Sequence, residues 1–219
     1  MEQAWIFVIF ILIAVGLIGL SLYLAYRRRR AIEAIAPQLG LQFIGKGNQL
    51  VPSVVWSFNL FSKGRSRQVF NVLKGQANGA DIFLFDYSYR IGSGKHSSTQ
   101  YHTVALLCAE SLDLPAFLLT PENLFHKIGN LFGYHDIDFD DYPLFSERYL
   151  LRGSDEARIR QIFDYRVIPF YEKRQRICSE GLGNALIYYR TEGRLNPDRW
   201  AELLSSAQEV VGLLRPWGR

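Results

Sequence analysis

The longest apolar stretch of the chain lies near its N-terminus. Residues 4–26 read AWIFVIFILIAVGLIGLSLYLAY and contain no charged side chain. A helix of this length would reach about 34 Å, which is enough to cross a hydrocarbon core of about 30 Å. The pattern therefore predicts one transmembrane helix.

Both ends of this stretch carry residues that are typical of membrane–water interfaces. Seven residues are predicted to lie there: Trp5, Tyr23, Tyr26, Arg27, Arg28, Arg29 and Arg30. Aromatic rings favour the interface, and basic residues stay on the cytoplasmic side. We therefore expect the N-terminus outside and the rest of the chain in the cytoplasm.

A cleaved signal peptide is the alternative interpretation of the apolar stretch. It would need a basic start, a shorter apolar region and a cleavage site of small residues. Here the chain begins Met-Glu-Gln, and arginines occupy the cleavage zone. A retained anchor fits better, which divides the chain into an anchor, residues 1–30, and a body, residues 31–219.

Alternating hydrophobic positions predict strands in the body. Residues 69–74 and 80–91 flank Asn78-Gly79, a pair suited to a tight hairpin turn. Aromatic residues at odd positions from Phe83 to Tyr89 share one face and are expected in the core. The opposite face carries Asp86 and Ser88 and is expected to become wetter toward residue 90. Further strands are expected at residues 99–109, 116–120, 149–152, 176–180 and 185–190.

Helical spacing predicts a continuation of the anchor and three further helices. They are expected at residues 27–39, 121–132, 155–163 and 197–214. Thr120, Ser154 and Asn196 are expected to cap the last three. Hairpins with helices grouped between and after them indicate an α+β fold, in which one antiparallel sheet packs against helices.

Composition and charge limit the class of protein. Hydrophobic residues are 48% and charged residues 21%, so the body is neither disordered nor fibrous. The net charge is +4, but residues 31–219 hold 21 basic and 20 acidic side chains. A nearly neutral body argues against binding of nucleic acid. Cys108 and Cys178 alone cannot form a disulfide framework or a structural zinc site.

The acidic stretch DIDFDD is the strongest candidate for chemistry. Asp136, Asp138 and Asp140 alternate as the ligands of a hard cation do, and Glu147 falls where an EF-hand loop places its last ligand. The position that needs a turn glycine is Asp141, so we expect no calcium site. A hydrolase assisted by a metal at these aspartates is the alternative function.

Other patterns give no catalytic set. Gly94-Lys95 lacks the remaining residues of a phosphate-binding loop, and no nucleophile elbow is present. The histidines have no metal-ligand spacing: His96, His102, His126 and His135. We therefore expect no cofactor and no metal. The basic residues Lys63, Arg65 and Arg67 form either a solvated loop or a contact with anionic headgroups.

Short motifs of the body resemble a group of uncharacterised bacterial single-pass membrane proteins. They are FxLFxxGRxR from Phe58, FDYxY from Phe85, GSGK from Gly92, PxFxLxPE from Pro115, FxKIG from Phe125 and DIDF from Asp136. The resemblance covers the anchor and most of the body. It implies a bacterial inner membrane and a domain of unknown function.

These observations predict a membrane-anchored cytoplasmic domain that binds a partner or scaffolds a complex without catalysis. The expected partners are the lipid bilayer, its anionic headgroups and an unidentified protein. A membrane-tethered hydrolase is the alternative, and a sensor of lipids or small ligands is a third function that the pattern leaves open.

Overall fold

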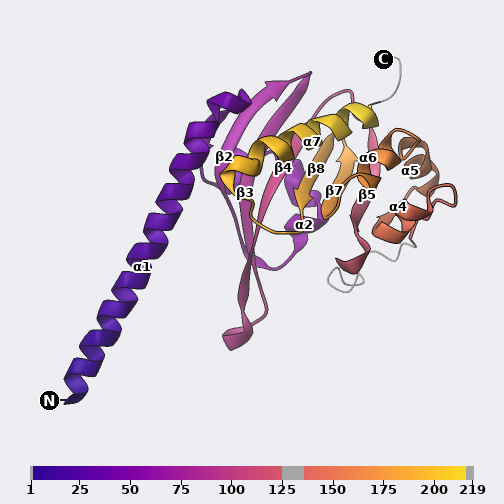
Figure 1. Cartoon of the computed structure of the whole chain (residues 1–219). Helices are drawn as coiled ribbons and strands as arrows, with labels where there is room; N and C mark the ends of the chain where they lie inside the picture. Colours follow the sequence, from indigo (N-terminus) through magenta and orange to yellow (C-terminus); the bar gives the residue numbers. More distant parts are fainter. Residues whose placement is uncertain (1, 125–135, 216–219) are drawn as a thin grey trace.

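One long helix extends away from the rest of the molecule. The computed structural model describes residues 2–124 and 136–215, and its first element is helix α1 (Glu2–Ile35). Figure 1 shows α1 projecting from the sheet with its N-terminal end far from the other elements. A 3₁₀ turn (Pro37–Leu39) follows, and Gly40 ends it with a left-handed φ of 67°. The predicted continuation of the apolar helix through the arginines to residue 39 is confirmed.

The apolar part of α1 is solvent-exposed. Its mean hydropathy is 2.7, and none of its membrane-length window is buried in the molecule. Phe10 and Leu22, for example, are each 67% exposed. A core helix of a soluble protein would be mostly buried, so this helix is a membrane anchor or a signal sequence by length and composition.

The remaining chain folds around one eight-stranded sheet. The strands are β1 (Gln42–Gly45), β2 (Arg65–Ala77), β3 (Ala80–Ile91), β4 (Ser98–Cys108), β5 (Leu114–Pro121), β6 (Tyr149–Gly153), β7 (Ile177–Gly183) and β8 (Ala185–Arg190). Their order is β1-β2-β3-β4-β8-β7-β5-β6, and all neighbours are antiparallel. The α+β class and its antiparallel sheet are confirmed.

The β2–β3 hairpin has the predicted turn. Asn78 and Gly79 have φ values of 52° and 71°, and Ala77 lies opposite Ala80. Asparagine and glycine adopt positive φ more readily than other residues, which fixes the turn and the register. Strand β2 runs longer than the predicted residues 69–74, whereas β3 has the predicted bounds.

The helices in the described part of the body lie between and after the strands. They are α2 (Asn59–Ser62), α4 (Pro143–Arg148), α5 (Glu156–Ile162), α6 (Val167–Glu172) and α7 (Trp200–Leu214). The seven buried residues of α7 are those that its helical spacing indicated: Trp200, Leu203, Leu204, Ala207, Val210, Val211 and Leu214.

Two of the three predicted helix caps are wrong, and the third, Asn196, holds the predicted N-cap position without a side-chain bond. Thr120 lies in β5 opposite Leu150, and the helix expected after it lies mainly outside the described residues. Asp155 rather than Ser154 caps α5, since its side chain accepts a 3.0 Å hydrogen bond from the N–H of Arg158. Asn196 precedes a 3₁₀ turn and makes no side-chain cap bond.

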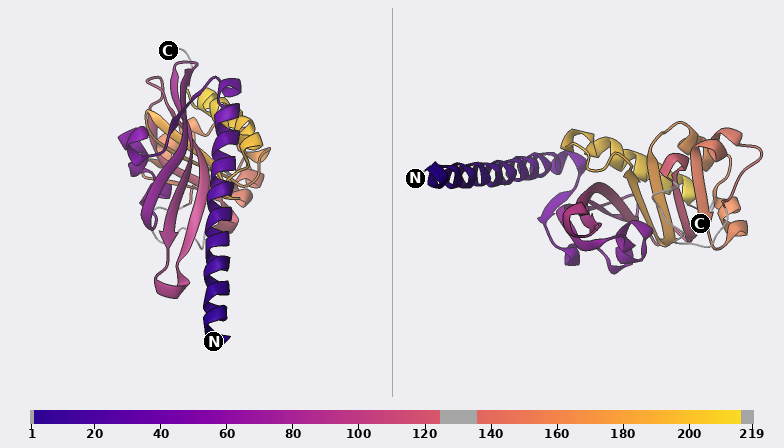
Figure 2. Two further views of the ribbon diagram at one scale, coloured as in Figure 1. Left: turned by 90° about the vertical axis from the view of Figure 1, so that its left-hand side faces the viewer. Right: turned by 90° about the horizontal axis from the view of Figure 1, so that it is seen from below.

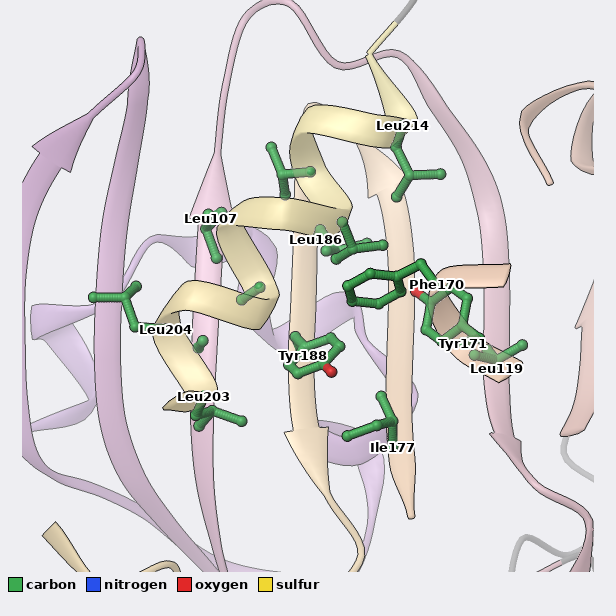
Figure 3. Packing of buried hydrophobic residues seen from close by; sticks show 14 of the residues in the cluster. Leu107, Leu119, Phe170, Tyr171, Ile177, Leu186, Tyr188, Leu203, Leu204 and Leu214 are labelled. Atoms are coloured by element: carbon green, nitrogen blue, oxygen red, sulfur yellow. The ribbon is translucent and has the colours of Figure 1, made fainter. Parts of the chain in front are cut away.

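The sheet has a hydrophobic core on each face. Helix α7 covers one face, and Figure 3 shows its leucines over Leu107, Leu186 and Tyr188. Residues 51–61 cover the other face, where the aromatic row of β3 lies. Successive strand residues point to opposite faces, so β3 supplies both cores. The prediction that the aromatic row is core is confirmed.

Candidate functional site

A buried ion pair joins α1 to the sheet. Nε and Nη2 of Arg28 each donate a 2.8 Å hydrogen bond to the Asp86 carboxylate, one to each oxygen. The Asp86 side chain is fully buried, and that of Arg28 is 12% exposed. This two-pronged geometry is the strongest form of arginine–carboxylate pairing. On the face of β3 that was expected to become wetter toward residue 90, Asp86 and Ser88 are buried, and exposure begins only at Arg90.

Two further side chains complete the coordination of the Asp86 carboxylate. Asn71 donates from Nδ2 to one oxygen, and Thr103 donates from Oγ1 to the other, each at 2.9 Å. The Thr103 hydroxyl also accepts from the N–H of Leu195 at 3.0 Å. Asn71 has a φ of 55° and lies in an irregularity of the β2–β3 pairing. Strands β2, β3 and β4 therefore all contribute to the partner of one helix arginine.

Apolar packing reinforces this junction. Trp200 is fully buried with its ring 5.9 Å from the Arg28 guanidinium carbon, which is cation–π range. Ile32 and Ala36 are buried in the core that α7 covers. The helix that carries the apolar stretch is therefore continuous with a helix packed on the sheet, rather than joined to it by a loose linker.

The other three arginines of residues 27–30 have partners on α1 itself. Arg29 and Arg30 both pair with Glu33, at 2.8 Å and 3.3 Å, and Arg27 lies over the Tyr23 ring. The placement of these arginines and of Trp5 at a membrane interface stays a prediction. Arg28 differs from these three arginines, because its N–H groups bind a carboxylate on the sheet.

An open groove lies beside the junction, between α1, β1, β2 and β4. Its volume is about 740 Å³. Its lining includes these aromatic and cationic side chains: Tyr26, Arg29, Phe43, Lys46, Phe70, Tyr101 and Arg194. We call it the junction groove. The Arg194 guanidinium lies 4.8 Å from the Tyr101 ring, and Phe70 meets the same ring edge-on at 6.3 Å.

A second, smaller cavity of about 130 Å³ lies near α2 and includes Glu180 in its lining. This buried carboxylate accepts hydrogen bonds from the N–H groups of Asn59 and Leu60 and from the Tyr189 hydroxyl. Burial raises the pKa of Glu180 to about 7 against the opposing effect of Lys63. Its bonds serve the start of α2, so its evident role is structural. No sequence pattern marked it.

The surroundings of the two thiols and of His102 disfavour their charged forms. Burial raises the pKa of Cys108 to about 11 and that of Cys178 to about 12, so both thiols stay protonated near neutral pH. Burial lowers the pKa of His102 to about 4, and its ring stacks on Tyr89. His96 is exposed, while His126 and His135 lie outside the described residues.

The acidic stretch lies beside β6. Asp136 accepts a 2.9 Å hydrogen bond from the N–H of Leu151, and burial raises its pKa to about 6. Ile137 is buried, whereas Asp138 and Asp140 are exposed, which accounts for the alternation. Within residues 2–124 and 136–215, no three His, Cys, Asp or Glu side chains gather as metal ligands would.

The basic residues after α2 have different surroundings: Arg67 binds the backbone, whereas Arg65 is exposed. Arg67 donates to the carbonyl oxygens of Ser62 at 2.6 Å, Lys63 at 3.2 Å and Gly64 at 3.2 Å, so it holds a turn. Arg65 is exposed at the start of β2. The loop of Gly94-Lys95 joins β3 to β4 and precedes no α-helix.

Comparison with known proteins identifies a shared fold. No protein-family model matches the chain, and no curated protein matches its sequence. The fold is similar to the crystal structure of the mycobacterial trehalose monomycolate transport factor A, TtfA, with a TM-score of 0.62. The match covers 86% of this chain and 96% of that chain at 14% identity. At this identity the likeness concerns the fold alone.

Proposed function

We propose that this chain is a membrane-anchored, non-catalytic factor that binds lipid at the inner face of a bacterial inner membrane and takes part in lipid transport. The observation that carries the proposal is the junction groove. Tyr26, the last residue of the apolar stretch of α1, and Arg29, which lies just after it, both line the groove. A groove in this place would open at the membrane–water boundary.

The chemistry of the junction groove suits an amphiphile. Phe43, Phe70 and Tyr101 offer apolar surface, while Lys46 and Arg194 offer positive charge. Ligand sites combine predominantly apolar walls with a few polar groups that fix orientation. A lipid whose polar head meets the cations and whose apolar part meets the rings would satisfy both.

The transport role is supported by the fold. TtfA is a trehalose monomycolate transport factor, and this chain shares its fold. One anchor helix encloses no path through a bilayer, so a transport role requires a partner membrane protein. The orientation with the body in the cytoplasm follows from the four arginines after the apolar stretch.

Photo-crosslinking tests whether the groove holds lipid. A photoreactive phenylalanine analogue replaces Phe70 in the full chain, and the protein is irradiated in native bacterial membranes. We expect a covalent lipid adduct, identified by mass spectrometry. The control carries the analogue at Tyr165, which is 69% exposed and lies away from the groove. No lipid adduct at Phe70, or equal yields at the two positions, would contradict the proposal.

A further inference from the structure

The β3–β4 hairpin extends beyond the neighbouring strand β8. Strand β4 pairs with β8 only from Val104 to Cys108, whereas it pairs with β3 as far as Ser98. The distal part of the hairpin therefore projects past β8. Figures 1 and 2 show that it projects in the same direction as the N-terminal end of α1. We call residues 90–98 the hairpin tip.

The Arg28–Asp86 ion pair sets the height of the tip relative to the helix. From Asp86 to Ile91 the strand advances by about 17 Å. A helix covers this length in about 11 residues. Counted from Arg28 toward the N-terminus, 11 residues lead well into the charge-free stretch of α1. If α1 spans a bilayer, the strand is therefore long enough to carry the tip past the level of Arg27 and Tyr26, so the tip meets the membrane surface instead of stopping short of it.

The base of the tip carries an unbalanced charge. Arg65 on β2 lies directly opposite Arg90 on β3. Like charges in such a pair repel each other. Both side chains are exposed, and neither forms an ion pair within the described part of the chain. Lys95 adds a further exposed cation at the turn, and no Asp or Glu occurs from residue 87 to 109.

Basic side chains outnumber acidic ones over the whole half of the chain next to the anchor. Residues 1–109 contain 11 basic and 4 acidic side chains, whereas residues 110–219 contain 14 basic and 17 acidic. The first half forms α1 and strands β1 to β4, which are one side of the sheet. An anionic surface on this side would balance the charge.

We propose that the hairpin tip, together with Arg65, is a second membrane contact that binds anionic lipid headgroups. The exposed side chain of Ile91, at 43%, would add apolar contact at the interface. The body is then held at two points, by α1 and by the tip, which fixes its tilt over the bilayer. The inference deepens the proposed function and rests on its premise that α1 spans the membrane.

The test uses the full chain in lipid nanodiscs. An environment-sensitive fluorophore is attached at Ser93→Cys in a background that carries Cys108→Ala and Cys178→Ala. One set of nanodiscs contains phosphatidylcholine alone, and the other contains an equal mixture with phosphatidylglycerol. We expect a blue-shifted emission and protection from an aqueous quencher in the anionic nanodiscs, with both effects decreasing as salt rises.

Charge-reversal variants distinguish a headgroup contact at the tip from a general attraction between the protein's net charge and the anionic bilayer. Arg90→Glu with Lys95→Glu is expected to abolish the blue shift. The matched control is Lys173→Glu with Arg176→Glu, which changes the net charge equally at exposed sites in the other half of the chain. Circular dichroism and thermal unfolding confirm that each variant is folded.

Two results would overturn the inference: equal emission in the two kinds of nanodisc, or equal loss of the shift in the two charge-reversed variants. The outcome is distinguishable from failure of the lipid-binding function. A lipid adduct at Phe70 without a blue shift at Ser93 would reject the tip contact alone.

Discussion

Replacing Asp86 by alanine is expected to lower the free energy of unfolding of the full chain by about 3–5 kcal/mol, because the change leaves a buried arginine without its partner. The Arg28 side chain is only 12% exposed, so water cannot replace the carboxylate fully. Asn71 and Thr103 also lose an acceptor. Urea unfolding in detergent micelles, followed by tryptophan fluorescence, measures the loss.

Arg29→Ala is the matched control for this prediction. Its ion pair with Glu33 lies on one helix surface, with side-chain exposures of 57% and 24%. Such pairs contribute about 0.5 kcal/mol or less. A loss for Asp86→Ala no larger than that of the control would show that the pair contributes little. The double variant Arg28→Met with Asp86→Leu is expected to lose less than Asp86→Ala, since it leaves no unpaired buried charge.

Trp200→Ala is expected to lower the free energy of unfolding by about 3–5 kcal/mol, the range for removing a large buried aromatic side chain. Trp200 is fully buried at the first residue of α7, and its ring lies beside Arg28. The cavity would therefore weaken both the α7 core and the junction between α1 and the sheet. The same urea titration measures the effect.

Trp56→Ala provides the comparison for Trp200. Trp56 is half-buried and contacts Phe61 edge-on on the opposite face of the sheet. Because its removal leaves a site that water can enter, we expect a clearly smaller loss of stability. Equal losses for the two variants would contradict the central place of Trp200 in the packing.

Local patterns predicted the elements of the fold well. The apolar run of α1, the Asn78-Gly79 turn and the seven-residue stripe of α7 all depend on neighbours within a few turns or strands. The helix caps were predicted less well, because the residue types that favour caps also occur next to a cap or at the end of a strand. Ser154 and Asp155 are adjacent and both favour caps, and the Thr120-Pro121 pair that would start a helix ends a strand instead.

The candidate site could not be predicted from local patterns. Arg28 and Asp86 are 58 residues apart, and each had an adequate local explanation as a translocation stop or as a solvated strand residue. Their contact depends on how the C-terminal part of α1 packs against the sheet. The order of the strands, in which β4 meets β8 and β5 lies between β7 and β6, likewise follows from long-range pairing. Glu180 was missed for the same reason.

The central claim is that α1 and the sheet form one rigid unit through Arg28 and Asp86. Spin labels at Leu24→Cys on α1 and Tyr165→Cys on the body, both exposed positions, report on it by pulsed electron paramagnetic resonance in lipid nanodiscs. Cys108→Ala and Cys178→Ala remove the native thiols. We predict one narrow distance distribution that broadens in Asp86→Asn. A broad distribution in the parent, or an unchanged width in Asp86→Asn, would contradict the account.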